Sequence, residues 1–547
     1  MEKRDYSKLQ NGSDIRGVAM EGFPGELPNL TSNEAIRIAR GFLLWLCEKT
    51  GKKPAELKIA IGRDPRITGM ELKYGLLNGF GPYGVETLDC GLASTPAMFM
   101  STLFPGFKCD GAIMITASHL PFNRNGFKFF DKDGGLNKED ISSILRNAES
   151  DERLKKLSPF LTNKPPETSR MTQYPAKAVP LMDTYCEHLQ NLIRRGVNHS
   201  LTFDKPLTGM KIVVDAGNGS GGFYATKVLE PLGADISASQ FLKPDGRFPN
   251  HAPNPEDKAA IESICKAVKE AGADLGLIFD TDVDRSAAVD NNGKEIARNG
   301  IVAMAASLVA ERFPGTTIVT DSITSTELTD FLENVLELKH LRFRRGYKNV
   351  INKAIELNAA GEDCQLAIET SGHAAMKENH FLDDGAYLAT KIVIKAAKLF
   401  AIGKTIDTVL EELKEPAEAE EVRIPIKPEA IDAAGGLAEV GDKVIAELSQ
   451  WAKNYPGMEL VQPNYEGVRI AFDMEPTPRR SSSEADEKAD TPLKGWCLLR
   501  KSLHDPLLPL NVESSAEGGC RRIYELLYGF LAQYDELDTS PLKAKLF

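Results

Sequence analysis

Three carboxylates stand at alternate positions in the segment DTDVDR (residues 280–285), directly after the apolar run 275–279. At about 5 Å and an effective dielectric of about 20, each pair of such charges costs about 3 kcal/mol. A hard divalent cation removes this repulsion, and Mg²⁺ prefers oxygen ligands. The segment lacks the glycine and the glutamate that an EF-hand loop requires. We therefore predict a Mg²⁺ site, with a solvated acidic turn as the alternative, and its ligands would be Asp280, Asp282 and Asp284.

A serine and a histidine stand side by side at Ser118 and His119, just after the apolar run Gly111–Ile115. Serine, proline, asparagine and glycine are turn residues, so an ordinary turn is one interpretation. A Ser-His-Asp hydrolase is disfavoured, because adjacent residues of an extended loop are expected to point apart and the chain has no G-x-S-x-G motif. Phosphoryl transfer commonly places a metal beside phosphate oxygens. A serine that carries a phosphoryl group beside Mg²⁺ therefore accounts for both loops.

Strand-like and helical sequence patterns alternate over roughly the first four hundred residues, and these elements must position the two loops. The alternation indicates α/β architecture. Three apolar runs, 111–115, 274–279 and 366–368, each open directly into a polar loop. In open α/β sheets, ligands bind beyond the carboxyl ends of the strands. We therefore expect three similar units that each deliver one loop to a common cleft.

The whole chain has 547 residues, which is too long for one hydrophobic core and suggests three or four domains. Its formal net charge of −12 argues against nucleic acid or an anionic membrane as the main partner, although phosphate ligands need only a local cluster of Arg and Lys. The eight cysteines are scattered without a C-x-x-C motif, which fits reduced thiols. No secretory or membrane-spanning segment is apparent. We expect a cytoplasmic enzyme, or a plastid stromal one if a transit peptide has been removed.

Four motifs in combination resemble the α-D-phosphohexomutases, the phosphoglucomutase/phosphomannomutase superfamily. They are Thr116-Ala-Ser118-His-x-Pro with Asn125-Gly-x-Lys128 after it, DTDVDR, Glu369-Thr-Ser371-Gly-His373, and Asp14-Ile-Arg16-Gly17. The resemblance covers essentially the whole chain. It implies three similar α/β domains with mixed sheets and a smaller α+β C-terminal domain around a central active-site cleft. We place these domains at residues 1–203, 204–312, 313–420 and 421–547.

The resemblance also implies roles for individual residues. Ser118 would carry the phosphoryl group and serve as a further Mg²⁺ ligand, with His119, Lys128 and Arg16 as the other catalytic residues. Lys128 and Arg16 can neutralise a transferring phosphoryl group, and Lys128 can also shuttle a proton. The residues expected to bind substrate are Arg285, Lys348, Glu369, Ser371, His373, Arg500, Ser502 and His504. The implied cofactors are Mg²⁺, phosphoserine and a hexose bisphosphate such as glucose 1,6-bisphosphate.

The C-terminal phosphate loop departs from the family's Arg-x-Ser-x-Thr-Glu-Pro pattern. Arg500, Ser502 and Pro506 match it, whereas His504 and Asp505 replace the threonine and the glutamate. Two enzymatic interpretations stay open. The first is a mutase that interconverts hexose 1- and 6-phosphates of glucose or mannose. The second is a glucose-1,6-bisphosphate synthase that takes its phosphoryl group from a donor such as fructose 1,6-bisphosphate.

A third interpretation is a catalytically inactive regulator that binds sugar phosphates. It predicts damage at Ser118 or in DTDVDR, and both are intact.

The expected partners are hexose monophosphates and bisphosphates, with no nucleic acid and no membrane, and the protein would be a monomer or a homodimer. Two further segments read as unstructured: an acidic linker at Glu412–Glu421, and a disordered surface insertion at 476–494.

Overall fold

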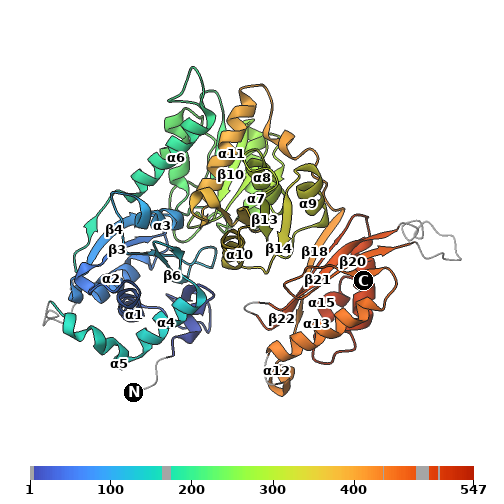
Figure 1. Cartoon of the computed structure of the whole chain (residues 1–547), viewed down its shortest axis with the longest axis horizontal. Coiled ribbons are helices and arrows are strands. Elements are labelled where there is room, and N and C mark those ends of the chain that lie inside the picture. Colours follow the sequence, from blue (N-terminus) through green and yellow to red (C-terminus); the bar gives the residue numbers. More distant parts are fainter. Residues whose placement is uncertain (1–4, 163–173, 435–436, 476–491, 503–504, 547) are drawn as a thin grey trace. The chain divides into compact units, whose positions relative to one another are not determined.

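The protein forms two compact units in a computed structural model that describes residues 5–162, 174–434, 437–475, 492–502 and 505–546 (Figure 1). The first unit consists of Met1–Phe313 and Ala354–Glu411, and the second of Pro314–Lys353 and Glu412–Phe547. None of the helices in the described part of the chain combines the length and the apolar character that a membrane crossing requires.

The first unit begins with an eight-stranded mixed sheet, in which β3 is parallel to β4 and β5 whereas β6 is antiparallel to β2 and β5. The order of its strands is β1 (Gln10–Asn11), β2 (Asp14–Val18), β6 (Arg124–Asp131), β5 (Gly111–Ile115), β3 (Lys58–Arg63), β4 (Glu86–Leu92) and β8 (Lys177–Ala178), with β7 (Gly134–Gly135) beside β6. Every residue of β5 is buried, which is typical of a strand in the middle of a covered sheet.

Helices cover both faces of this sheet. Successive residues of a strand point to opposite faces. On β6 the ring of Phe129 lies 4.9 Å from Phe42 of α1 (Ser32–Thr50), while that of Phe130 lies 6.1 Å from Phe99 of α3 (Thr95–Leu103). A capping box at Thr31 and Glu34 begins α1, and Gly51 ends it in a left-handed conformation. The helices here are α1 (Ser32–Thr50), α2 (Gly69–Phe80), α3 (Thr95–Leu103), α4 (Lys138–Glu149), α5 (Asp151–Leu154) and α6 (Leu181–Val197).

Two further groups of strands complete the first unit. A four-stranded sheet has the order β12 (Glu295–Ile296), β11 (Ser286–Val289), β10 (Leu275–Phe279) and β9 (Ile212–Asp215). β10 is parallel to β9 and antiparallel to β11, and both β9 and β10 are entirely buried. β15 (Cys364–Ile368), β16 (Ala374–Met376) and β17 (Leu382–Asp383) pair in antiparallel fashion. The helices of this part are α7 (Lys258–Ala271), α8 (Asn299–Ala310) and α11 (Gly385–Phe400).

The second unit contains the parallel pair β13 (Thr317–Thr320) and β14 (Lys339–Arg342), followed by an antiparallel five-stranded sheet. That sheet has the order β18 (Glu418–Pro425), β22 (Leu507–Ser514), β21 (Leu493–Leu499), β20 (Val468–Met474) and β19 (Met458–Leu460). Its core contains Ile424, Ile470 and Leu510 together with Leu448 and Leu527 of the helices. The remaining α-helices of the described residues are α9 (Thr326–Asp330), α10 (Tyr347–Ala359), α12 (Pro428–Ala434), α13 (Leu437–Lys453), α14 (Gly519–Leu531) and α15 (Ser540–Lys543).

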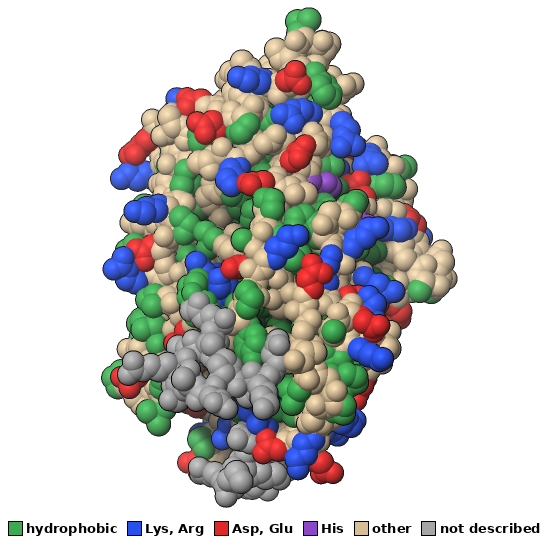
Figure 2. Space-filling model, turned by 90° about the vertical axis from the view of Figure 1, so that its left-hand side faces the viewer, with side chains coloured by type: hydrophobic (Ala, Val, Ile, Leu, Met, Phe, Trp, Pro, Cys, Tyr) green, Lys and Arg blue, Asp and Glu red, His purple; other side chains and the backbone are tan. Residues whose placement is uncertain are grey.

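The α/β architecture with mixed sheets and a C-terminal sheet domain is confirmed. The predicted acidic linker is wrong over its last four residues, because Glu418–Glu421 belong to β18 and their exposure alternates as in a strand with one solvated face. The predicted insertion lies outside the described residues up to 491, and Leu493 and Lys494 belong to β21. The domain boundaries at 203, 312 and 420 stay predictions. On the face shown in Figure 2, positive and negative side chains are interspersed.

Candidate active site

The loops that follow β5, β10 and β15 come together in the first unit. Ser118 Oγ, in the loop after β5, donates a hydrogen bond to Asp280 Oδ2 of the loop after β10 at 3.0 Å. The loop after β15 joins them, because the backbones of Arg285 and His373 form an antiparallel bridge. Three strand ends that are distant in sequence therefore share one site.

Ser118 is 6% exposed and has a left-handed backbone conformation, with φ +48°. Few residues other than glycine adopt this conformation, and it costs about 1–2 kcal/mol. Its Oγ also lies 3.4 Å from Arg285 Nη2 and 3.4 Å from Nδ1 of the exposed His119. Our expectation that Ser118 and His119 point apart is therefore wrong, because the left-handed residue turns the chain sharply between them. The 3.4 Å contact is longer than a normal hydrogen bond to a hydroxyl.

The carboxylates of DTDVDR form a compact buried cluster. Oxygens of Asp280, Asp282 and Asp284 lie within 4.8 Å of one another, and all three residues are 0% exposed. Burial and the charges of Asp284 and Asp282 raise the pKa of Asp280 well above its usual value. Among the described residues, Asp282 Oδ1 and Asp284 Oδ1 find no hydrogen-bond partner, and both oxygens are buried. Buried carboxylate oxygens without donors fit a site for a hard divalent cation such as Mg²⁺.

One strand residue and one helix residue support this cluster. Lys128 on β6 forms an ion pair with Asp284 and lies 3.8 Å from Asp282 Oδ2. Burial alone would raise the pKa of Asp284, but the positive charges of Lys128, His373 and Arg285 together outweigh burial and lower that pKa. Thr95, the first residue of α3, donates its backbone N–H to the Asp282 carbonyl at 2.8 Å and its hydroxyl to the Asp282 carboxylate.

Arg285, the residue that ends DTDVDR, is 2% exposed and faces the same carboxylates. Its backbone N–H donates to Asp280 Oδ1 at 3.2 Å and its Nε to Asp280 Oδ2 at 3.3 Å. Nη1 donates to Asn254 Oδ1 at 3.2 Å and lies 3.7 Å from Glu256 Oε2. Asn254 and Glu256, which hold the far edge of this guanidinium, were not anticipated from the sequence.

Arg16, on β2, approaches the Ser118 loop from another side. Its Nη1 donates to the Thr116 carbonyl, and its Nη2 donates to Asp14 Oδ2 at 2.8 Å. The guanidinium thus contacts the loop two residues before Ser118. The prediction that Arg16 neutralises a transferring phosphoryl group stays a prediction.

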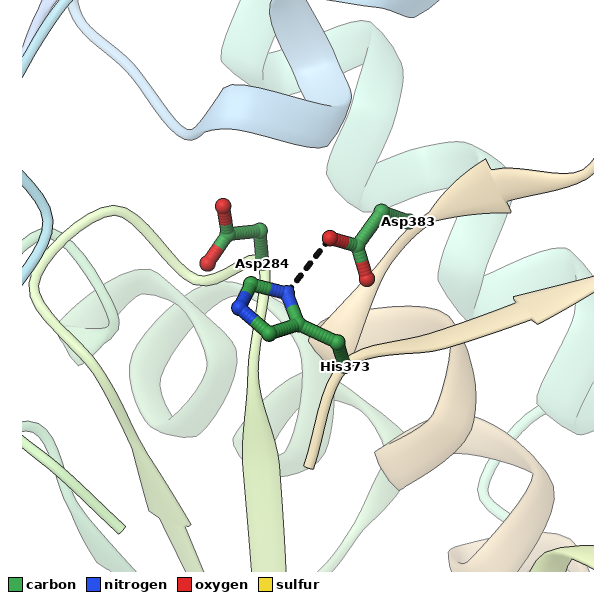
Figure 3. Close-up of side chains that lie close together, drawn as sticks. All are labelled: Asp284, His373 and Asp383. Carbon is green, nitrogen blue, oxygen red and sulfur yellow. Dashed lines mark hydrogen bonds and ion pairs between the residues drawn. The ribbon is translucent and has the colours of Figure 1, made fainter. Parts of the chain in front are cut away.

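His373 joins the carboxylate cluster to a fourth aspartate, which sequence reasoning missed (Figure 3). Its Nδ1 lies 2.5 Å from Oδ2 of Asp383 on β17, while Asp383 Oδ1 accepts the backbone N–H of Ala374 at 3.1 Å. Burial by itself lowers the pKa of His373, but the charges of Asp383 and Asp284 outweigh it and raise the pKa to about 9. An acidic residue just before α11 was the available sequence signal, and Asp384 beside it caps that helix instead.

The sugar-recognition candidates Glu369 and Ser371 lie in the same loop as His373, and both are buried. Ser371 Oγ is 3.4 Å from Glu369 Oε2, and Glu369 N–H donates to the His373 carbonyl at 2.9 Å. Gly372, between Ser371 and His373, has φ +92°, and a Cβ there would lie 2.6 Å from the Ser286 carbonyl oxygen. The turn that places these side chains therefore requires glycine.

The remaining candidates belong to the second unit. Arg500 is 5% exposed, and its backbone N–H donates to the Pro509 carbonyl at 3.1 Å. Its Nε is buried and has no hydrogen-bond partner in the described part of the chain. Burial and then the nearby charge of Arg345 lower the pKa of Arg500. Lys348, near the start of α10, is half-buried. Arg500 and its neighbour Arg345 are two cations with an unused donor on Arg500, which fits a site for an anion.

The other two residues of the predicted phosphate loop are Ser502 and His504. Ser502 N–H donates to the Leu507 carbonyl at 3.1 Å, and Ser502 Oγ accepts the N–H of Asp505 at 3.1 Å. His504 lies outside the described residues.

Comparison with known proteins identifies the family. Residues 7–155, 183–293 and 298–416 match the alpha/beta/alpha domains I, II and III of phosphoglucomutase/phosphomannomutase. The chain is 28% identical over 478 residues to a phosphomannomutase/phosphoglucomutase of Pseudomonas syringae, covering 87% of each chain. It is 30% identical over 422 residues to a phosphoglucosamine mutase of Lactobacillus helveticus, covering 76% of this chain and 84% of the relative.

Solved structures agree on the fold. The crystal structure of a phosphoglucomutase/phosphomannomutase family protein from Burkholderia thailandensis superposes with a TM-score of 0.70 at 24% identity, covering 95% of this chain and 96% of the other. Together with the three matching domains, this shows that the chain belongs to the phosphoglucomutase/phosphomannomutase family of the α-D-phosphohexomutases.

Proposed function

We propose that this protein is a phosphohexomutase that moves a phosphoryl group between O1 and O6 of hexose phosphates through a 1,6-bisphosphate. The observation that carries the proposal is the position of Ser118 Oγ, 3.0 Å from Asp280 in a cluster of three buried carboxylates. A phosphoryl group on this oxygen would lie beside the cation that the carboxylates can hold. Mg²⁺ bound there would supply charge neutralisation for the phosphoryl oxygens.

In the transfer step, the bond between phosphorus and Ser118 Oγ breaks and a bond forms between phosphorus and a sugar hydroxyl oxygen. The proton of that hydroxyl passes through a base to Ser118 Oγ. The serine becomes a free hydroxyl and the sugar becomes a bisphosphate; the reverse step at the other end of the sugar restores the phosphoserine. Arg285 Nη2, 3.4 Å from Ser118 Oγ, can stabilise the charge that spreads over the transferring group. Lys128 can offset the same charge and relay the proton.

Substrate binding is assigned to two sets of residues. Glu369 and Ser371 present a carboxylate and a hydroxyl that can bind ring hydroxyls. Arg500, with Ser502 beside it, offers a charged donor for the phosphate that is not transferred. We propose glucose 1-phosphate and glucose 6-phosphate as the main substrate pair, with the mannose phosphates as a second pair.

A phosphorus NMR time course tests the proposal. The purified protein is mixed with Mg²⁺, glucose 1-phosphate and a catalytic amount of fructose 1,6-bisphosphate. A mutase accumulates glucose 6-phosphate far beyond the fructose bisphosphate consumed. Glucose 1,6-bisphosphate that instead accumulates in step with fructose 6-phosphate would identify a bisphosphate synthase, and the mutase assignment would then be wrong.

The control is Ser118→Ala, analysed in parallel by intact-protein mass measurement. The unchanged protein should show a fraction heavier by one phosphoryl group, and the variant should not. No turnover and no phosphorylated species with any hexose bisphosphate would contradict both enzymatic assignments and favour a sugar-phosphate-binding regulator.

A further inference from the structure

Arg66, in the loop between β3 and α2, makes an unusual set of contacts with the turn that contains Ser118. Its side chain is completely buried. Nη1 and Nη2 donate hydrogen bonds to backbone carbonyls at 2.5–3.0 Å, and the four acceptors are Ser118, Leu120, Pro121 and Arg124. One guanidinium thus satisfies four carbonyls of a seven-residue turn, which is the full capacity of its two terminal nitrogens.

The guanidinium is itself held from two further directions. Its Nε lies 3.2 Å from Asp64 Oδ2, an ion pair without a directed hydrogen bond, and Asp64 Oδ1 accepts the Arg66 backbone N–H at 2.9 Å. Asp64 N–H donates to the Ile115 carbonyl at 3.0 Å, which ties this segment to the last residue of β5. The ring of Phe248 lies over the guanidinium, with its centroid 5.2 Å away. Arg66 therefore has little freedom to move relative to β5.

The nearest acceptor is the carbonyl of Ser118, the residue with the left-handed backbone. Such strain persists only where surrounding contacts over-determine the conformation. The conformation also decides the direction of Ser118 Cβ, and thus the 3.0 Å approach of Oγ to Asp280. A contact on the carbonyl of this residue acts directly on the peptide plane that sets that direction.

We propose that Arg66 is a positioning residue for Ser118, whose guanidinium gathers the carbonyls of residues 118–124 and so holds Ser118 Oγ toward Asp280. Arginine suits this role because its donors form a fixed planar fork, whereas lysine carries three donors on a flexible stem. Arg66→Lys therefore cannot serve four carbonyls in one plane and leaves some of them buried without a donor. The kinetic part of the test rests on the proposed function, and the hydrogen-exchange part does not.

The experiment compares the unchanged protein with Arg66→Lys. Hydrogen–deuterium exchange should be at least about tenfold faster for amides of residues 116–125, while β3 and β5 keep their protection. In the mutase assay kcat should fall about 100-fold, because a misplacement of about 1 Å costs that much. KM should change less than about threefold, because Arg66 is buried and holds the nucleophile rather than the sugar. The rate at which a hexose bisphosphate phosphorylates Ser118 should fall with kcat.

The matched control is Arg63→Lys, three residues before Arg66. Among the described residues, the Nη1 atom of Arg63 donates a hydrogen bond only to the Asp64 carbonyl. It should leave the exchange of residues 116–125 and kcat unchanged. Normal loop exchange in Arg66→Lys, or a KM that rises as much as kcat falls, would overturn the proposal.

If Arg66→Lys does not fold, Asp64→Asn decides the question. This variant keeps the guanidinium but removes the carboxylate charge that orients it. Hydrogen exchange of residues 116–125 should therefore become faster, and kcat should fall about tenfold. Unchanged exchange and kcat in that variant would overturn the proposal. If the unchanged protein neither turns over hexose phosphates nor becomes phosphorylated, the proposed function is wrong. The hydrogen-exchange data would still test the positioning role of Arg66.

Discussion

Lys128 and Asp284 form an ion pair between two buried side chains, although 156 residues separate them in the sequence. Lys128 comes from β6 of the first sheet and Asp284 from the loop after β10. A buried pair of this kind adds little net stability, but removing one partner leaves an uncompensated buried charge. The pair therefore makes the correct assembly of the two sheets a condition for a stable carboxylate cluster.

Lys128→Met should destabilise the protein by about 3–5 kcal/mol in EDTA, because Asp284 then stays buried without its cation. Adding Asp284→Asn should recover most of this loss but none of the activity. Urea unfolding of the three proteins measures the free energies. Lys49→Met is the control, since the Lys49 side chain is 40% exposed and its ion pair with Asp131 should contribute at most about 1 kcal/mol. Equal instability of the single and double variants would contradict the pairing argument.

Asp282→Asn should stabilise the metal-free protein, because it removes one of three buried carboxylates that repel one another. Millimolar Mg²⁺ should raise the thermal midpoint of the unchanged protein, since a ligand that binds only the folded state stabilises it, and should raise that of the variant much less. Turnover should fall at least about 100-fold. Glu262→Gln, on the exposed face of α7, should change none of these values. A full Mg²⁺ response in Asp282→Asn would disprove the metal assignment.

Arg500→Ala should raise KM for hexose phosphates at least about tenfold and lower kcat much less, because it removes a charge-assisted donor from the phosphate that is not transferred. Arg423→Ala is a close control. Both arginines lie near Glu421, Arg500 Nη2 at 4.0 Å and Arg423 Nε at 3.0 Å, but the Arg423 side chain is 67% exposed. Steady-state kinetics on both variants decides the question. An unchanged KM in Arg500→Ala would mean that another loop binds this phosphate.

His340 should make the second unit sensitive to acid. Its ring lies between the hydroxyls of Thr320, 2.8 Å from Nε2, and Thr329, 2.9 Å from Nδ1. Burial and the charges of Arg342 and Arg469 lower the pKa of His340 well below its usual value. Below about pH 6.5 the unfolded chain therefore binds a proton that the folded protein does not, and stability falls as the pH falls.

The measurement is the free energy of unfolding between pH 7.5 and about 5 for the unchanged protein and His340→Gln. The free energy of unfolding should depend differently on pH in the two proteins only below about pH 6.5, where the variant should lose less stability. His380→Asn, at an exposed left-handed position that asparagine tolerates, should keep the slope of the unchanged protein. If the free energy of unfolding falls equally with pH in the unchanged protein and in His340→Gln, the charged His340 ring stays solvated in the folded protein.

Several elements could be predicted because their signals are local. β5 and β10 are short, wholly apolar runs that end at a polar residue, so their bounds follow from the hydrophobic pattern. The strand at Glu418–Pro425 was missed because three of its first four residues are glutamates, and only its pairing with β22 shows that it is a strand. Acidic residues are depleted in strands, so tertiary pairing overrode the local preference here.

The sequence singles out some residues of the candidate site but not others. Ser118 and the three aspartates stand out because their types and spacing suit phosphoryl transfer and Mg²⁺. Asp383 and Arg66 gave no such signal, since an isolated aspartate or arginine has many ordinary roles and their importance depends on contacts with residues far away in sequence.

By itself, the sequence determined the chemistry available to this protein: a serine and a carboxylate cluster, each placed after an apolar strand, together with cationic side chains. The tertiary structure alone decided how these groups face one another. Ser118 and Val283 both have left-handed backbones, with φ +48° and +68°, which no local preference of serine or valine predicts. Contacts made across the fold, such as those of Arg66 with the Ser118 turn and of Gly385 N–H with the Val283 carbonyl at 3.2 Å, stabilise these conformations. Local sequence specifies which atoms can react, whereas their separation depends on long-range packing, which is a property of the whole folded chain.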